Sequence, residues 1–168
     1  RVSLDQIVTP QLSTGLVVES ISDEGYLNNP YRSARYLDPD VAAGFAWEPE
    51  VYPNTRNSTA VSVNAQYFVW YRAAIHGMYR YFTDSWGVDA STVRVGYTHP
   101  IGDRWIVEFN YRWYDQSAAD FYADLFPRRD AQNFLARDKE LSTFTSQMLS
   151  IGATFVLIIA FDDLRRER

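Results

Sequence analysis

Between residues 105 and 116 the chain alternates, one position at a time, between apolar and polar side chains. The apolar positions are Trp105, Val107, Phe109, Tyr111 and Trp113. The positions between them include Glu108, Asn110, Arg112 and Tyr114. A repeat of two residues predicts a β-strand, because successive side chains leave an extended backbone on opposite faces. We therefore expect one apolar, ring-rich face and one polar face in this segment.

Similar alternation recurs along the chain and predicts an antiparallel all-β fold. The predicted strands are 2–8, 13–22, 59–69, 74–83, 91–99, 105–116 and 144–157. Some neighbours are joined by tight reversals, such as the one at Pro100 to Asp103, where Pro and Gly-Asp suit a short turn. Two connections are long, at about 23–58 and 117–143. The first contains four prolines and is expected to be an irregular loop.

Short turns at one end of the strands and long loops at the other are typical of an up-and-down transmembrane β-barrel. No apolar run reaches the ~18–20 residues that a membrane helix needs. A soluble barrel of the lipocalin type would instead turn its apolar side inward. The alternation alone leaves these two arrangements open, so the positions of the aromatic residues become decisive.

Aromatic residues make up 16% of the chain, with 12 Tyr, 10 Phe and 5 Trp. At a rise of ~3.3 Å per residue and a tilt of ~40°, Trp105 and Trp113 stand roughly 20 Å apart along a barrel axis. That separation is near the ~25 Å apolar band that aromatic girdles flank in membrane barrels. The predicted girdle comprises Trp70, Tyr71 and Trp105 at the short-turn end and Tyr81, Trp86, Trp113 and Tyr114 toward the long-loop end. We therefore predict that the apolar face meets lipid and that the polar face lines a lumen.

The predicted lumen carries charges of both signs on neighbouring strands. The candidate lining residues are Glu19, Arg80, Asp84, Arg94, Glu108 and Arg112. Rings of such charges would select ions or small solutes in a pore. Alternatively, they pair across strands and fill a narrow interior, since buried charges need partners. The paired arrangement is slightly favoured.

Other chemistry finds little support in the sequence. The net charge of −5 argues against a nucleic-acid binder, and the absence of Cys excludes disulfides and thiolate metal sites. His76 and His99 fall on different predicted strands without a nearby carboxylate cluster, so we predict no catalytic residue, no metal site and no cofactor. A membrane-embedded hydrolase built on Ser, His and Asn or Asp is a remote alternative.

Two further groups of charged residues have competing interpretations. The loop carboxylates Asp23, Glu24, Asp38 and Asp40 could bind Ca²⁺, but a solvated loop is favoured because no recognised ligand spacing is present. The segment 127–130, together with Arg165, Arg166 and Arg168, either contacts anionic lipid or lipopolysaccharide or is solvated.

Several longer motifs resemble a known family. They are GYLNNPYRS (25–33), YRYFTDSWGVDASTVRVGY (79–97), HPIGDRW (99–105), YDQSAADFY (114–122) and DKELSTF (138–144). In order, and over most of the chain, they resemble a family of Gram-negative outer-membrane β-barrel proteins that carries a domain-of-unknown-function label. The resemblance implies an outer-membrane location, and members of that family are longer than this chain and begin with a signal peptide.

Seven predicted strands are an odd number, whereas single-chain bacterial barrels have even numbers. An open sheet would leave bare edges in lipid. We therefore expect residues 1–168 to be a single segment of a larger outer-membrane barrel. The alternation slips after Leu157, where residues 158–168 could belong to a further strand.

The expected function is a porin-like channel, or a conduit that holds a partner protein. The alternative is a non-conducting anchor for external loops in a cell-surface complex. Outer-membrane lipid and lipopolysaccharide are the expected partners, and periplasmic or lipoprotein partners in a larger complex remain open. No enzymatic activity is expected.

Overall fold

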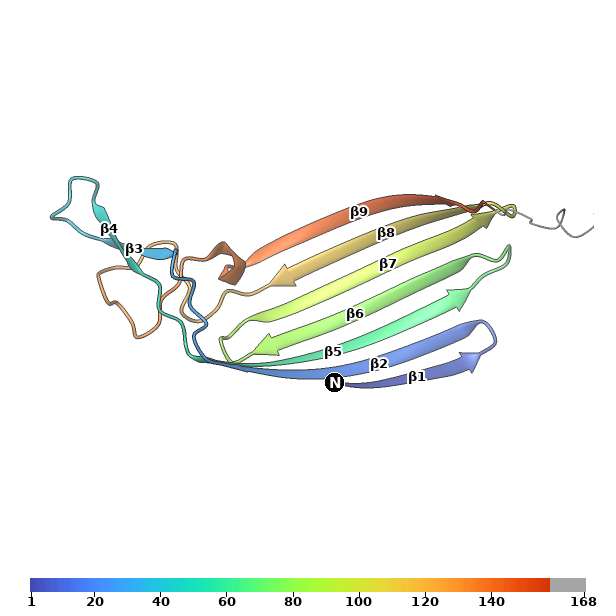
Figure 1. Ribbon diagram of the computed structural model, residues 1–168, viewed down its shortest axis with the longest axis horizontal. Helices are drawn as coiled ribbons and strands as arrows, with labels where there is room; N and C mark the ends of the chain where they lie inside the picture. The colour runs from blue at the N-terminus through green and yellow to red at the C-terminus, as the bar shows by residue number, and fades with distance from the viewer. Residues whose placement is uncertain (158–168) are drawn as a thin grey trace, which may run out of the picture.

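The computed structural model describes residues 1–157 of the chain and shows an all-β protein built on one antiparallel sheet (Figure 1). Seven strands lie side by side in the order β1-β2-β5-β6-β7-β8-β9. Their bounds are Val2–Thr9 (β1), Leu12–Glu24 (β2), Thr55–Phe68 (β5), Ala74–Asp84 (β6), Asp89–Ile101 (β7), Trp105–Gln116 (β8) and Phe144–Phe155 (β9). Within this sheet, the order of the strands in space is their order along the chain. This confirms the predicted up-and-down arrangement.

The strands begin and end close to the predicted positions, but several extend further toward the long-loop end. The β2–β5 pairing continues to Glu24 and Thr55, beyond the expected limits at Ser22 and Thr59. Polar side chains stabilise this extension, because the Ser22 hydroxyl donates a hydrogen bond of 2.7 Å to the Asn57 side chain. Hydrophobic alternation therefore marked the middle of these strands and missed their polar ends.

The registers place most of the apolar positions of the seven strands on one face. Val63, for example, lies between Leu16 of β2 and Tyr79 of β6, and Tyr111 lies between Val95 of β7 and Leu149 of β9. This face is uncovered: exposed fractions reach 51% at Val63 and 72% at Leu149. Within residues 1–157, no second sheet or helix packs against it.

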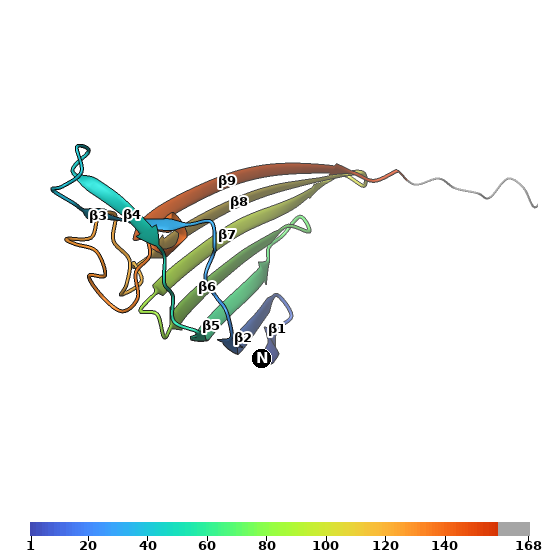
Figure 2. The same ribbon diagram turned by 60° about the vertical axis from the view of Figure 1, so that its left-hand side comes forward.

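The sheet is curved and open. Figure 2 shows it bent along its width, with β1 and β9 at opposite margins. In the described part of the chain these two edge strands pair only with β2 and β8, so the sheet does not close into a barrel. The sequence predicted a segment of a larger barrel, and residues 1–157 form an open antiparallel sheet of seven strands.

The two long connections form a compact cap at one end of the sheet. The connection from β2 to β5 contains a hairpin, β3 (Ser33–Leu37) paired with β4 (Phe45–Pro49), where the sequence predicted irregular loop. The connection from β8 to β9 pairs with this hairpin: the Leu37 N–H donates to the Phe126 carbonyl at 2.9 Å, and the Phe126 N–H donates to the Arg35 carbonyl at 2.8 Å. The only helix in residues 1–157 is the 3-10 turn Lys139–Leu141, and no helix there has the length and hydropathy to cross a membrane.

The cap, not the sheet, contains the hydrophobic core of the described chain. One cluster of buried side chains consists of Tyr52, Trp86, Val88, Ala119, Phe121, Ala136 and Leu141. A second consists of Ala34, Tyr36, Phe126 and Leu135. Both clusters join residues from connections far apart in the sequence, so these connections pack against one another.

Candidate functional site

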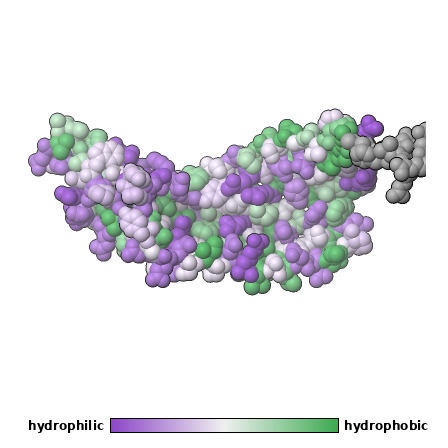
Figure 3. Space-filling view, in the orientation of Figure 1, coloured by the Kyte–Doolittle hydropathy of each residue, from purple (hydrophilic) through white to green (hydrophobic). Residues whose placement is uncertain are grey.

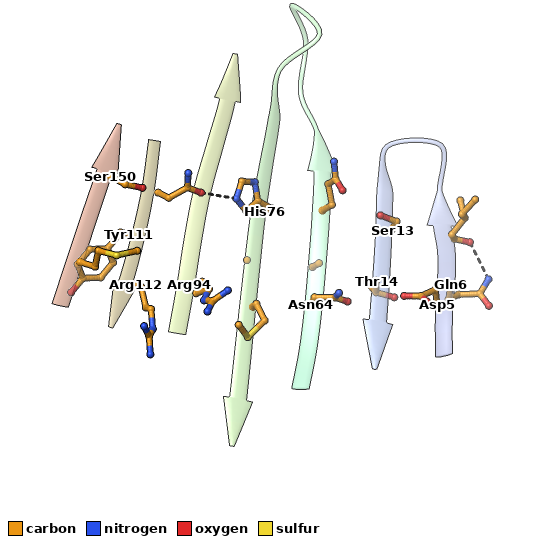
Figure 4. Close-up of a pocket in the computed structure, with 17 residues that line it drawn as sticks. Asp5, Gln6, Ser13, Thr14, Asn64, His76, Arg94, Tyr111, Arg112 and Ser150 are labelled. Atoms are coloured by element: carbon orange, nitrogen blue, oxygen red, sulfur yellow. Dashed lines mark hydrogen bonds between the residues drawn. The ribbon is translucent and has the colours of Figure 1, made fainter. Parts of the chain in front are cut away.

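The polar face of the sheet holds a hollow of about 1030 Å³. Most of its lining side chains occupy the polar positions of the alternation, and they come from every strand of the sheet (Figure 4). Those used below are Asn64, His76, Arg94, Asn110, Arg112 and Ser150. On the broad side shown in Figure 3, hydrophilic side chains lie among neutral and apolar ones over the strands and are densest at the cap end. The hollow thus combines polar side chains with the apolar side chains of Ile7, Met78 and Met148.

Two glycines, Gly96 and Gly15, leave room for polar side chains of neighbouring strands to extend over the strands that carry the glycines. At Gly96 of β7, an added Cβ would lie 1.9 Å from His76 Nε2 and 2.5 Å from Asn110 Oδ1. At Gly15 of β2, it would lie 2.2 Å from Asn64 Oδ1. Any larger residue would displace these groups. The glycines thus allow hydrogen-bonding groups to lie flat on the floor of the hollow.

Two arginines stand next to each other in the hollow. Arg94 of β7 and Arg112 of β8 are direct cross-strand partners (Figure 4). Arg112 packs over the ring of Tyr114, with its guanidinium carbon 5.2 Å from the ring centre. The Nε atom of Arg112 is buried and has no hydrogen-bond partner in the described chain. Among residues 1–157, neither arginine forms a salt bridge. This pair is the most concentrated positive charge on the polar face.

The other predicted lining residues also occupy polar-face positions, and two of them are paired. Arg80 and Glu19 come within 3.5 Å, and Asp84 accepts from Arg56 at 2.6 Å near the cap. The Asp84 side chain is fully buried, and its other oxygen accepts backbone hydrogen bonds from Trp86 and Val88. Glu19, Arg80 and Asp84 thus form ion pairs with side chains of other strands, whereas Arg94 and Arg112 form none among residues 1–157.

Glu108 lies away from these pairs. It is the cross-strand partner of Thr98 and of Gly152, two rows from Arg112 toward the short turns. The structure thus does not bring all six predicted lining residues into one ring.

The structure places the predicted girdle residues in three different surroundings. Trp105, Tyr81 and Trp113 occupy apolar-face positions, and Trp105 packs on Phe155 with ring centres 5.0 Å apart. Trp70 and Tyr71 lie in the exposed turn between β5 and β6.

Two girdle assignments are wrong. Trp86 is only 5% exposed, because it lies inside the cap, where its Nε1 donates to the Thr55 carbonyl at 2.9 Å. Tyr114 lies on the polar face, in register with Thr92, and its hydroxyl donates to Gln116. In both cases the type of side chain was given more weight than its position.

His76 and His99 each form a hydrogen bond with a different side chain and do not belong to one cluster. His76 Nε2 is 3.0 Å from Asn110 Oδ1, whereas His99 Nδ1 is 2.7 Å from the Tyr97 hydroxyl. Across the described residues, no group of three or more His, Cys, Asp or Glu side chains is placed to hold a metal ion. The basic residues Arg165, Arg166 and Arg168 and the segment 158–168 lie outside the part of the chain that the structure describes.

Sequence reasoning missed two buried carboxylates in the cap. Glu50 is 4% exposed, accepts a hydrogen bond from the Tyr52 hydroxyl at 2.6 Å and accepts another from the Arg137 backbone at 2.8 Å. Glu48 accepts from the Asp130 backbone N–H. Burial, followed by the hydrogen bond to Glu50, raises the pKa of Tyr52 far above its ordinary value. No local pattern signals these carboxylates, because their partners on the second long connection are more than 80 residues away in the sequence.

Comparison with curated proteins and with solved structures found no match to this chain. A family match covers residues 1–160, and this family carries a domain-of-unknown-function label, as the resemblance of the sequence motifs implied. The chain belongs to the family described as Protein of unknown function (DUF3570).

Proposed function

We propose that this chain is a section of a bacterial outer-membrane β-barrel, and that its polar face lines a lumen that conducts or holds a hydrophilic solute or partner. The observation that carries this proposal is the pairing of two unlike faces on one sheet. One face is apolar, ring-rich and uncovered across seven strands, and the other is polar and hollowed. A soluble sheet would bury the first face against a second layer.

The exposed apolar face is too extensive for a water-facing surface. Leu149 and Ile151 are 72% and 68% exposed, and similar side chains continue to Val2 and Leu4 at the other edge. Monomeric soluble proteins rarely expose contiguous apolar patches beyond a few hundred Å². Contact with hydrocarbon would remove this surface from water, at about 25 cal/mol per Å² of apolar area.

Strand length also suits a bilayer. The strands β5 to β9 contain 11 to 14 residues, and about 9–11 tilted residues cross the hydrocarbon layer. The extra residues fall largely at the polar, long-loop ends, where strands of membrane barrels emerge into water.

The edges of β1 and β9 require further strands in a membrane, because unpaired backbone groups cost several kcal/mol each in hydrocarbon. We propose that chain outside residues 1–157 supplies these strands and closes the barrel. The aromatic residues Trp105, Tyr81 and Trp113 would then lie near the lipid headgroups, where rings with one polar edge are favoured.

A conductance measurement tests the channel function. The full-length protein, purified and inserted into planar bilayers, is expected to give discrete current steps in KCl. Protease protection of the strands measures whether the protein has inserted. Absence of current through bilayers that contain inserted protein would contradict a conducting lumen.

A non-conducting anchor is the second candidate, and the cap favours it. The two long connections are folded around their own core, with Arg32 and Asp138 forming a salt bridge between them. A preformed surface of this kind suits a partner in a cell-surface complex. Absence of current, together with partners that co-purify with the wild type and are lost when the cap core is disrupted, would favour anchoring.

We also propose that the chain has no catalytic activity of its own. The nearest candidate groups, His76 and His99, are engaged by Asn110 and Tyr97 rather than by a nucleophile and an acid. Lipid hydrolysis by the purified protein that disappears in a His76→Ala or His99→Ala variant would contradict this proposal.

A further inference from the structure

Three arginines form the basic centre of the polar face. Arg80, Arg94 and Arg112 lie on the adjacent strands β6, β7 and β8. Arg94 is directly opposite Arg112, and Arg80 is one row away, opposite Thr92. Glu19 partly balances Arg80. Among residues 1–157, no carboxylate lies within salt-bridge distance of Arg94 or Arg112.

Like charges directly opposite each other on a sheet are destabilising. Arg112 adds a second cost, because its buried Nε has no hydrogen-bond partner in the described residues, and a buried donor without an acceptor is unfavourable. A bound anion would offset both costs: it would balance the two guanidinium groups and supply acceptor oxygens.

The neighbouring groups supply further donors and no carboxylate. The cross-strand row beside Arg94 and Arg112 contains His76, Asn110 and Ser150. The Asn110 carbonyl oxygen is turned toward His76 Nε2, at 3.0 Å, and this leaves its amide group as a donor. The cross-strand row that contains Arg94 and Arg112 reaches a carboxylate only at Asp5 among the described residues. Asp5 lies on the edge strand β1, four strands away from Arg94.

We propose that Arg94 and Arg112 form a binding site for an oxyanion, a carboxylate or phosphate group carried by a small solute. Guanidinium groups match such groups in charge and geometry, because each presents two parallel N–H donors. The assignment names the solute class for the proposed lumen and to that extent rests on the proposed function, although binding itself requires only the folded sheet.

Equilibrium binding tests the site independently of conduction. The full-length protein in detergent micelles is titrated with inorganic phosphate, and binding is followed by ³¹P line broadening. Arg94→Gln and Arg112→Gln should each weaken binding about tenfold or more, and the double variant should abolish it. Arg94→Lys keeps the charge but removes the paired donors, so it should also weaken binding.

The matched control is Arg128→Gln/Arg129→Gln, which removes two charges from the exposed segment 127–130 and should leave binding unchanged. Strand content by circular dichroism verifies that each variant folds. Phosphate binding equal in wild type and double variant would overturn the site, as would no binding to the wild type, because carboxylates from the remaining barrel would then balance the arginines.

Reversal potentials in planar bilayers separate this site from the proposed channel. Anion selectivity that falls in the double variant supports both. Arginine-dependent binding without any current supports the site and contradicts conduction. Current whose anion preference is the same in wild type and double variant contradicts the site as a selectivity element.

Discussion

His76 of β6 and Asn110 of β8 meet across the intervening strand, 3.0 Å apart, and they do so directly above Gly96. The contact exists because the residue beneath it has no side chain. Gly96→Ala should therefore break the hydrogen bond and destabilise the protein by about 1–2 kcal/mol. Urea unfolding of the full-length protein measures the difference.

A double-mutant cycle identifies the cause. In a His76→Ala background, Gly96→Ala should cost much less, because no bond remains to be broken and the Asn110 amide is free to turn away. Gly77→Ala is the matched control, since the nearest atom to its added Cβ is the Arg94 carbonyl oxygen at 4.0 Å. Equal costs of Gly96→Ala with and without His76 would contradict this account.

The turn between β5 and β6 places two non-glycine residues in the left-handed region, Tyr71 at φ 64° and Arg72 at φ 63°. This conformation costs roughly 1–2 kcal/mol for each L-residue. Arg72→Gly should therefore stabilise the protein by about 1 kcal/mol, even though it removes an exposed ion pair with Asp103 at 3.6 Å, which contributes little. Arg72→Ala keeps the strained backbone and should give no such gain. An equal gain in both variants would show that the side chain, not the backbone, is responsible.

Trp86 holds the cap together. It packs edge-on against Tyr52 and Phe121, with ring centres 5.6 and 5.3 Å away, and it is almost fully buried. Trp86→Ala should destabilise the cap by about 3–5 kcal/mol and expose the long connections to protease. Trp70→Ala, at a site that is 80% exposed, should leave protease resistance unchanged. Equal resistance in both variants would mean that the cap does not depend on its aromatic cluster.

Alkaline pH should weaken the cap through Tyr52. Its pKa is raised in the folded state by burial and by the hydrogen bond to Glu50, whereas in the unfolded chain it ionises near pH 10. The folded state thus keeps a proton that the unfolded state releases, so the stabilisation is complete below pH 10 and is lost as pH rises above it. The free energy of unfolding should fall above pH 10 by up to about 1.4 kcal/mol per pH unit from this group. Tyr52→Phe should remove that part of the slope, and an unchanged slope would contradict the assignment.

The repeat of two residues was sufficient to locate all seven strands of the main sheet and to sort their faces. It also fixed the neighbourhood of Arg94 and Arg112, because a tight reversal at Gly102 and Asp103 sets the register of the two strands that carry them. The placement of Tyr114 was open to the same reasoning: it shares its face with Arg112, two positions earlier. The aromatic ring of Tyr114 suggested a girdle position, but the alternation places this residue on the polar face.

Other features depend on contacts that no local pattern reports. The β3–β4 hairpin is short, and its position is fixed by a connection about 90 residues later, through the hydrogen bond from the Leu37 N–H to the Phe126 carbonyl. The burial of Trp86 has the same origin, since it follows from the meeting of both long connections. The hollow over Gly96 also needed the structure, because the sequence shows a glycine but not the two side chains that cross it.

The central claim is that hydrocarbon contacts the face bearing Val63 and Ile151, while water reaches the face bearing Asn64 and Ser150. Residues 1–168 contain no Cys. With any cysteine elsewhere in the full-length protein replaced by Ser, single cysteines at these four positions can carry a nitroxide in the protein reconstituted into bilayers. Electron paramagnetic resonance then compares the collision of each label with oxygen, which concentrates in lipid, and with a nickel chelate, which stays in water. We expect labels at Val63 and Ile151 to respond to oxygen and labels at Asn64 and Ser150 to respond to nickel. A response to nickel at all four positions, or the reverse alternation, would contradict the account.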